Sequence, residues 1–249
     1  MFRLLRERLS QKYRTIKFPL PLESMPEKFL GLPEISPLIE KDFTKLKDLC
    51  PVDAFVESKG EKGLDIGKCI FCGECGKSSK AIRFTKDYSL GSVEREDLVI
   101  TMNKNRIDKP TKDFLFKKLL KKSLKLRQVS AGGCNACEAD VNVLGTVGWD
   151  LGRFGIQFVA SPRHADGILV TGPVSKNMEM ALLKTYEATP KPKIVIACGS
   201  CAIDGGPFYD SEEVIKGVDK VLGVDLFIPG CPPHPATILI AILKFLQKV

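Results

Sequence analysis

Residues 126–141 read LRQVSAGGCNACEADV, and this stretch decides how the C-terminal half of the chain is expected to fold. The β-rich run LRQV ends near two glycines, and a helical segment follows the Cys-x-x-Cys pair. Further β-rich runs alternate with helical stretches at residues 157–160, 167–171, 193–197 and 225–228. This alternation predicts an α/β domain with a mostly parallel sheet over residues 128–249.

Four cysteines of this half are widely separated in the sequence. Cys134 and Cys137 lie in the stretch above, Cys201 lies in GSCAIDGGPF, and Cys231 lies in IPGCPPHP. Residues so distant in sequence meet only where the ends of parallel strands converge, and such folds gather their sites at that edge of the sheet.

Nine cysteines are informative once the compartment is considered. No apolar run approaches the 18 or so residues that a membrane span requires, and the N-terminal residues lack a signal-peptide core. We therefore expect a cytoplasmic chain. Because cysteines are rarely paired as disulfides in a reducing compartment, clustered ones indicate metal or redox chemistry.

The N-terminal cysteines follow a ferredoxin-type spacing. Cys69, Cys72 and Cys75 form a C-x₂-C-x₂-C run, but the position of a fourth cysteine is Ser79. Two-cluster ferredoxins use C-x₂-C-x₂-C-x₃-C-P runs, and the last cysteine of each run serves the other cluster. Cys50, followed by Pro51, matches the end of an earlier run.

That earlier run has lost its other three cysteines, which are replaced by Glu40, Phe43 and Leu46. The crossover rule then assigns the four remaining cysteines to a single 4Fe–4S cluster. They are Cys50, Cys69, Cys72 and Cys75. A structural zinc site is the alternative, although zinc sites usually use two separated Cys-x₂-Cys pairs.

The sequence around these cysteines resembles a known class of subunit. The stretch FPLPLESMPEKFLGLPEISP (residues 18–37), the later Cys-Pro and the Cys69–Cys75 run are similar to the ferredoxin-like subunits of membrane hydrogenases and respiratory complex I. The resemblance covers roughly residues 15–90 and departs from the family at the four lost cysteines. It implies a small α+β ferredoxin-like domain.

The C-terminal half carries a more specific resemblance. GGCNACE, SPRHADGILVTGPV, GSCAIDGGPF and IPGCPPHP, in that order, are similar to the small subunit of group 4 NiFe hydrogenases, which is homologous to the 20 kDa subunit of complex I. The resemblance implies a flavodoxin-like fold and a second, proximal 4Fe–4S cluster. Its implied ligands are Cys134, Cys137, Cys201 and Cys231.

Several neighbouring residues have two readings. Cys198 lies three residues before Cys201, yet the family pattern gives it no ligand role, and a small buried hydrophobe explains it. Glu138 is expected either to relay protons or to form a salt bridge. Arg163 and His164 are expected either near the cluster, where a cation would raise its potential, or in a solvated loop.

We expect four segments along the chain: an extended arm at residues 1–40, the ferredoxin-like domain at 41–95, a basic linker at 96–127 and the proximal-cluster domain at 128–249. Within the linker, residues 111–126 predict an amphipathic helix. Its apolar face would carry Phe116, Leu119, Leu120 and Leu124. Such a helix packs on the core, or its lysines contact a membrane surface or an acidic partner.

Together these features predict an electron-transfer subunit of a membrane-bound, energy-converting NiFe hydrogenase. The resemblance implies a NiFe-type large subunit, membrane-arm subunits and a ferredoxin or other iron–sulfur partner, with the chain peripheral on the cytoplasmic side. The substrate-reducing centre would lie in a partner. Cys137-Glu138 favours this over a nickel-free ferredoxin, quinone or polysulfide oxidoreductase of complex I type.

A zinc-binding nucleic-acid module is the other class considered, because the net charge is +8. No recognised nucleic-acid motif is present, and we expect no nucleic-acid partner.

Overall fold

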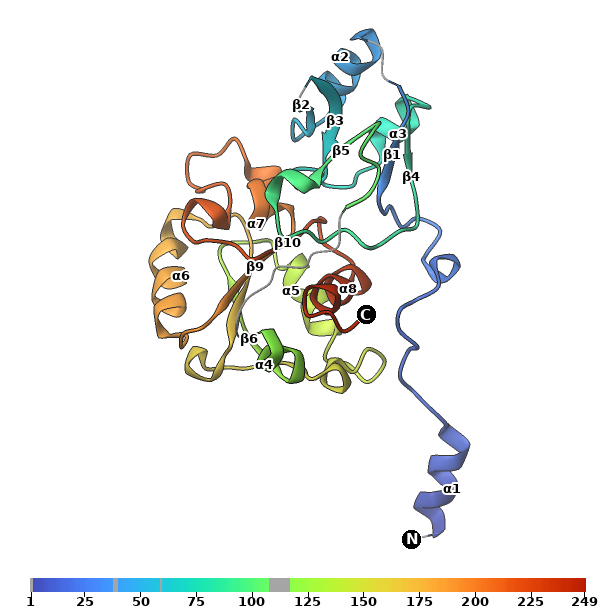
Figure 1. Cartoon of the computed structure of the whole chain (residues 1–249), viewed down its shortest axis with the longest axis vertical. Helices are drawn as coiled ribbons and strands as arrows, with labels where there is room; N and C mark the ends of the chain where they lie inside the picture. Colours follow the sequence, from blue (N-terminus) through green and yellow to red (C-terminus); the bar gives the residue numbers. More distant parts are fainter. Residues whose placement is uncertain (1, 38–39, 59, 108–116) are drawn as a thin grey trace.

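The computed structural model describes residues 2–37, 40–58, 60–107 and 117–249, and shows a small region packed on a larger sheet domain (Figure 1). The α-helices are α1 (Phe2–Gln11), α2 (Glu40–Leu49), α3 (Glu74–Ser78), α4 (Lys117–Lys122), α5 (Ala136–Val143), α6 (Lys176–Ala188), α7 (Ser200–Asp204) and α8 (Pro235–Phe245). The strands are β1 (Pro33–Ile35), β2 (Phe55–Ser58), β3 (Glu61–Asp65), β4 (Ile82–Phe84), β5 (Val99–Thr101), β6 (Leu124–Ser130), β7 (Ile156–Phe158), β8 (Gly167–Thr171), β9 (Ile194–Cys198) and β10 (Leu226–Ile228). Short 3₁₀ helices occupy Leu22–Ser24, Arg95–Leu98, Leu151–Phe154, Pro162–His164, Gly206–Phe208 and Val218–Lys220.

The C-terminal domain is built on a five-stranded parallel sheet. Its strand order is β10-β9-β8-β6-β7, and every neighbouring pair is parallel. Counted from β6, this is the order 2-1-3-4-5 of flavodoxin-like folds. The predicted flavodoxin-like fold is therefore confirmed.

Helices cover both faces of this sheet. Successive residues of β8 point to opposite faces, so Ile168 packs in the same core cluster as Leu182 of α6, whereas Leu169 packs in the cluster that contains Val141 of α5 and most of α8. As a result every residue of β8 and β9 is buried. Strands buried on both faces read as continuous apolar runs, as these do.

The small region is α+β, with two antiparallel sheets. β1 pairs with β4, and β2, β3 and β5 form the second sheet. These strands are only three to five residues long. The small α+β region matches the predicted fold class, and its sheets draw on β1 and β5, which lie on either side of residues 41–95.

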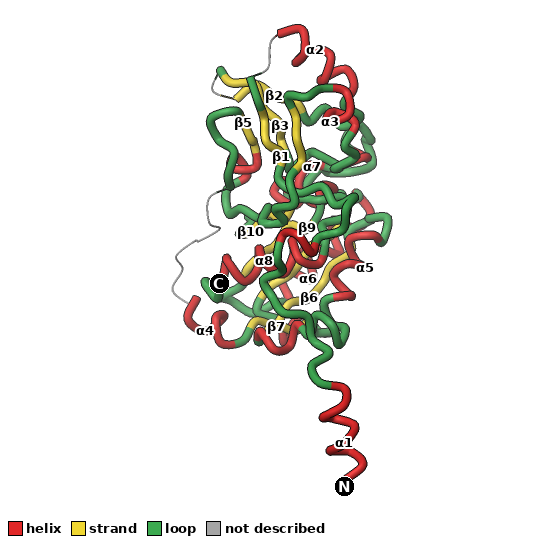
Figure 2. The backbone as a smooth tube through the Cα atoms, turned by 90° about the vertical axis from the view of Figure 1, so that its right-hand side faces the viewer, coloured by secondary structure: helices red, strands yellow, loops and turns green. Residues whose placement is uncertain are grey.

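The two regions share a core. One cluster of buried side chains contains Leu64 and Ile66 of the small region together with Val129 and Ile168 of the parallel sheet. Backbone hydrogen bonds between Ser92 and Phe227 join the regions as well, at 3.0 and 2.7 Å. In both views α7 lies where the two regions meet (Figures 1 and 2).

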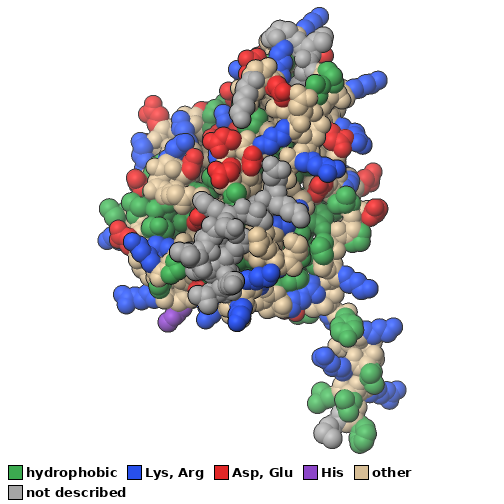
Figure 3. All heavy atoms as spheres, in the orientation of Figure 1, with side chains coloured by type: hydrophobic (Ala, Val, Ile, Leu, Met, Phe, Trp, Pro, Cys, Tyr) green, Lys and Arg blue, Asp and Glu red, His purple; other side chains and the backbone are tan. Residues whose placement is uncertain are grey.

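The N-terminal arm differs from the irregular segment predicted for residues 1–40. Residues Phe2–Gln11 form α1, none of whose side chains is buried, and Figure 3 shows its apolar and basic side chains standing away from the body. The apolar residues of FRLLRERL recur at helical spacing, a pattern that the Pro-rich composition further along the arm obscured.

The helix predicted over residues 111–126 is wrong at its C-terminal end. Helix α4 ends at Lys122, and β6 begins at Leu124. Leu124 and Leu126 are buried in the parallel sheet and alternate with Lys125 and Arg127, which is the period of a strand. Leu120 is buried as the inward-packing alternative requires, while Phe116 and the Leu119 side chain lie outside the described residues. No helix in the described part of the chain is both long enough and apolar enough to cross a membrane.

Candidate metal centres

The N-terminal centre consists of the four cysteines predicted from their spacing. Cys50 follows α2, and Cys69, Cys72 and Cys75 lie in and just after the loop between β3 and α3. All four line one small pocket of about 20 Å³. The rest of its wall is mainly apolar and includes Val52, Phe55, Leu64, Ile70 and Phe84. The structure therefore brings Cys50 to the remote C-x₂-C-x₂-C run.

Backbone N–H groups point at two of these sulfurs. The amide of Ala54 donates to Cys50 Sγ and the amide of Phe71 donates to Cys69 Sγ, both at 3.3 Å. Hydrogen bonds to ligand sulfurs stabilise the thiolate and tune the potential of an iron–sulfur cluster. The loop is thus shaped for negatively charged sulfur.

Two thiols of this centre, those of Cys69 and Cys75, resist ionisation. Burial, and secondarily the charges of neighbouring cysteines, raise the pKa of Cys69, and the same causes raise the pKa of Cys75 to about 11. Only a bound cationic group would compensate four thiolates in one cavity, and binding it would release protons. The donor set therefore fits a metal–sulfur group.

The C-terminal centre gathers cysteines from three strand ends. Cys134 and Cys137 follow β6, Cys201 lies in α7 after β9, and Cys231 follows β10. Burial raises the pKa of Cys137 to about 12, and the charges of Glu138, Cys231 and Cys134 add to this effect. The four cysteines are thus electrostatic neighbours at the carboxyl edge of the sheet, where the sequence predicted that they would meet.

Cys201 and Cys231 are the most closely paired of these residues. Their thiols are hydrogen-bonded, which raises the pKa of Cys201 and lowers that of Cys231 to about 7. The pair therefore keeps one proton between its two sulfurs instead of ionising twice. A metal that binds both sulfurs would again have to displace a proton.

Two glycines leave room for the sulfurs of this centre. Gly199 has φ +95°, and a Cβ there would lie 2.6 Å from Cys137 Sγ. Gly206 has φ +54°, and a Cβ there would lie 2.8 Å from Cys201 Sγ. Both positions need glycine for backbone conformation and for space. The residues present therefore fit a cluster with cysteine ligands.

Cys198 is buried in the apolar core at the end of β9, with no exposed surface. Its thiol does not line the cavity of the N-terminal centre, and burial raises its pKa well above the ordinary value. The prediction of a small buried hydrophobe is confirmed.

Glu138 lies next to Cys137 but points at hydroxyl groups. Ser130 and Thr171 each donate to Oε1 at 2.6 Å, which ties together the ends of β6 and β8. Burial raises the pKa of Glu138, but these two hydrogen bonds lower it by more, so the carboxyl stays ionised at neutral pH. Uncharged partners replace the salt bridge that we considered, and the proton relay stays a prediction.

Arg163 and His164 are not near the C-terminal centre. They precede β8 and therefore lie at the amino edge of the parallel sheet, whereas the four cysteines lie at the carboxyl edge. Both line a surface cavity together with Pro190 and Lys191. The expectation of a cation beside the cluster was wrong, because a loop that enters a parallel strand lies opposite the loops that leave it.

An ion-pair network lies where the two regions meet. No sequence pattern predicted it. Arg95 binds Asp65 through two hydrogen bonds of 2.9 and 2.8 Å, and lies 3.7 Å from Asp204 at the end of α7. Lys68, next to Cys69, also lies 3.7 Å from Asp204. Asp65 in turn accepts the Gly67 amide at 2.9 Å and so shapes the turn before Cys69. These contacts fix one cysteine loop against the other.

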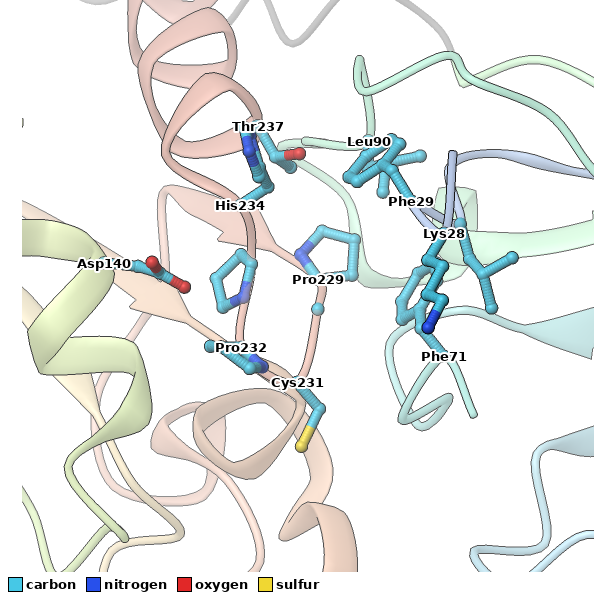
Figure 4. A pocket seen from close by; sticks show the side chains of 13 residues that line it. Lys28, Phe29, Phe71, Leu90, Asp140, Pro229, Cys231, Pro232, His234 and Thr237 are labelled. Atoms are coloured by element: carbon cyan, nitrogen blue, oxygen red, sulfur yellow. The ribbon is translucent and has the colours of Figure 1, made fainter. Parts of the chain in front are cut away.

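A larger pocket of about 290 Å³ is lined by residues of both regions. Figure 4 shows Phe71 and Lys28 from the small region on one side, and Cys231, Pro232 and His234 from the sheet domain on the other. Phe71 belongs to the Cys69–Cys75 loop. The loops of the two centres therefore share the wall of one cavity.

Comparison with known proteins places the C-terminal half in a family. Residues 134–245 match the family described as NADH ubiquinone oxidoreductase, 20 Kd subunit. A Pyrococcus furiosus protein described as "Probable membrane-bound hydrogenase subunit mbhJ" is 44% identical over 121 residues, which are 49% of this chain and 72% of that protein. An uncharacterized protein of Methanocaldococcus jannaschii is 44% identical over 128 residues, which are 51% of this chain and 86% of the relative.

A solved structure gives a similar alignment. A chain of the membrane-bound sulfane sulfur reductase, an archaeal respiratory membrane complex, is 39% identical, with a TM-score of 0.48, over 53% of this chain and 73% of that chain. The sequence matches define a subunit of a redox complex. The chain belongs to the family of the 20 kDa subunit of NADH ubiquinone oxidoreductase.

Proposed function

We propose that this chain relays electrons in a membrane-bound, energy-converting NiFe hydrogenase, through one 4Fe–4S cluster at each centre. The observation that carries the proposal is the presence of two four-cysteine groups in contacting domains, one of them in a domain of the hydrogenase-related family. The small domain takes the place of a separate ferredoxin-like subunit.

The cysteines would hold the clusters in the sets predicted from sequence. Cys50, Cys69, Cys72 and Cys75 would bind one cluster, and Cys134, Cys137, Cys201 and Cys231 the other. An iron–sulfur cluster supplies one-electron redox chemistry without making or breaking bonds in a substrate.

The cysteine spacing supports clusters over zinc, because zinc sites usually use two separated Cys-x₂-Cys pairs. A zinc ion with Zn–S bonds of about 2.3 Å draws its four sulfurs close together, whereas a cubane binds each cysteine at a different corner. A run of three closely spaced cysteines with a remote fourth next to a proline is typical of the larger group.

The exposure of the cysteines supports a path that crosses the chain. Cys72 and Cys134 are exposed, whereas Cys69 and Cys201 are buried. Cys69 accepts a hydrogen bond from Ser200, which precedes Cys201, where the two domains meet, and each centre also has one exposed cysteine. This is the arrangement that a relay between two external partners needs.

The H₂-handling centre would lie in a partner of the NiFe large-subunit type. With eight cysteines assigned and Cys198 sealed in the core, this chain has no cysteine pairs left to bind nickel. Cys137-Glu138 favours the hydrogenase branch over the complex I branch of the resemblance. Membrane-arm subunits would anchor the complex, with this chain on the cytoplasmic side and a ferredoxin or another iron–sulfur protein as electron partner.

A Cys72→Ala variant in the intact complex tests the relay. It should abolish electron exchange with the external donor but keep hydrogen–deuterium exchange at the partner's metal centre, because only the N-terminal centre loses a ligand. Surviving external electron transfer would make the N-terminal centre a side branch and would contradict the relay.

The same preparation separates the hydrogenase proposal from a nickel-free relative. A hydrogenase complex contains nickel and exchanges hydrogen isotopes. A complex that contains neither, but reduces a quinone or polysulfide, would keep the relay and replace the hydrogenase assignment.

A further inference from the structure

One buried hydroxyl joins the two centres. Ser200, the first residue of α7, has no exposed surface, and its Oγ donates to the backbone carbonyl of Cys69 at 2.7 Å. The same Oγ lies 3.2 Å from the Gly230 carbonyl, and the Ser200 amide donates to that carbonyl at 2.8 Å.

The residues in this contact either belong to the cysteine sets or lie next to them. Ser200 immediately precedes Cys201, Gly230 immediately precedes Cys231, and Cys69 belongs to the N-terminal centre. A single serine therefore hydrogen-bonds to the backbone of a cysteine loop in each domain, and its own backbone continues into a third cysteine.

We propose that Ser200 is a positioning residue for electron transfer between the two centres. It fixes the Cys69 loop against α7, so that covalent bonds and one hydrogen bond connect a sulfur of one centre to a sulfur of the other through Cys69, Ser200 and Cys201. This inference rests on the proposed function, since it requires a cluster at each centre. One electron leaves the reduced centre and reduces the other, and no chemical bond forms or breaks.

The depth of the contact explains why this hydroxyl matters. A hydrogen bond in a buried, water-free site is strong, and a carbonyl that loses its partner there is costly to leave unpaired. Without the hydroxyl, the Cys69 carbonyl would lose its hydrogen bond to α7. The Cys69–Cys75 loop could then move away from Cys201.

Other contacts between the domains should keep the protein folded when Ser200 is changed. Arg95 and Lys68 bind Asp204, and Ser92 pairs with Phe227 through the backbone, so the domains stay joined when one hydroxyl is removed. A change at Ser200 should therefore loosen the connection between the centres and leave the interface in place.

The test is the EPR spectrum of the fully reduced, full-length protein, for the wild type and Ser200→Ala. We expect two clusters in both proteins. The broadening caused by spin coupling between the clusters should decrease in Ser200→Ala, and the rate of electron exchange between the centres should fall several-fold. Ser200→Thr keeps the hydroxyl, so its spectral broadening and its rate of electron exchange should match those of the wild type.

Ser92→Ala is the matched control. Ser92 is also a buried serine at the domain interface, but its hydroxyl lies 3.4 Å from Asp97 and contacts neither centre. It should keep the wild-type spectrum. A loaded Ser200→Ala protein with wild-type coupling, or the same loss in Ser92→Ala, would overturn the assignment to Ser200.

Two further outcomes are also decisive. If Ser200→Ala does not load both clusters, the spectrum of Ser200→Thr decides: wild-type coupling supports the role of the hydroxyl, and altered coupling refutes it. A wild-type chain that never holds two clusters would instead refute the proposed function, which a separate iron measurement identifies.

Discussion

The two centres are built in opposite ways. Three cysteines of the N-terminal centre lie within residues 69–75, in a region whose strands have three to five residues. The C-terminal centre collects its cysteines from three strand ends spread over residues 134–231, above a sheet whose central strands are completely buried. The first site is local and has a small scaffold, whereas the second is assembled by a large core.

This difference implies that the centres depend on metal to different degrees. Small sheets of two or three short strands are marginally stable alone, and a bound metal group then contributes directly to folding. A buried five-stranded parallel sheet has its own core and holds its strand ends in place without metal. We therefore expect a metal-dependent small region and a metal-independent sheet.

Removal of iron should have the largest effect and should separate the two regions. In anaerobically chelated protein, amide hydrogen exchange should accelerate by orders of magnitude in β2, β3 and the Cys69–Cys75 loop, because their opening free energy falls toward zero. The amides of β8 and β9 should stay protected. Equal loss of protection in both regions would remove the distinction.

Arg95→Leu should be the most damaging single change at the junction. It leaves the buried Asp65 carboxylate without its cation, which costs about 3–5 kcal/mol. Denaturant unfolding of the loaded protein measures this. Arg83→Leu is the control, because Arg83 and Glu34 form an exposed pair on the same region, worth about 0–1 kcal/mol.

Gly199→Ala should eject the C-terminal cluster and leave the N-terminal one. The added Cβ would meet Cys137 Sγ at 2.6 Å in a rigid part of the sheet, and an L side chain is strained at φ +95° by about 1–3 kcal/mol. Iron content should fall by about half, as loss of one of two cubane clusters requires.

Gly73→Ala is the matched change in the other centre. Gly73 also has a positive φ, of +78°, but its Cβ would meet the end of the Leu30 side chain, which can move. Iron content should stay close to that of the wild type. Iron loss in Gly73→Ala but not in Gly199→Ala would contradict the expectation that only the C-terminal centre lacks room for an added Cβ.

Metal-free protein should lose stability at alkaline pH. The folded state raises the pKa of Cys75 to about 11 and that of Cys137 to about 12, above the value of about 8.5 for an unfolded cysteine. The stability from keeping these thiols neutral is complete below pH ~8.5 and is lost as the pH rises through about 11–12. Iron-loaded protein, whose thiolates are already ligated, should lack this loss in thermal melts between pH 8 and 11.

Cys198→Ser should change the iron content little. A hydroxyl placed in the apolar core without a designed partner costs about 1–3 kcal/mol, yet both clusters should remain because the resemblance gives Cys198 no ligand role. Cys50→Ser should do the reverse and remove the N-terminal cluster. Iron content and EPR signals compare the two, and loss of a cluster in Cys198→Ser would reopen the ligand assignment.

The sequence was most informative where a pattern is local. The run GILVT predicted β8 with the bounds that the structure shows, and the ends of the other C-terminal strands differ by at most two residues. Cys50 could be assigned to the same centre as the Cys69–Cys75 run because the Cys-Pro end of an earlier motif copy is still present, although the other three cysteines of that copy are lost.

The remainder depends on contacts that no spacing encodes. Leu120 and Leu124 fit one helical face, but pairing of Leu124 with β7 placed it in a strand. Ser200 and Arg95 act through partners 131 and 30 residues away, so neither stood out in its own segment. For Arg163 and His164 the solvated-loop alternative is confirmed, and the direction of the strand that follows them excludes the place near the cluster.

The most direct test of the account is the iron and acid-labile sulfide content of the anaerobically purified full chain, with Cys72→Ala and Cys201→Ala alongside. Two clusters predict about eight irons and eight sulfides per wild-type chain and about four of each in either variant. Mössbauer spectra should assign the remaining iron to a single cubane in each case. A wild-type content near four irons, or zinc in place of iron, would contradict the claim that each domain of this protein holds a 4Fe–4S cluster.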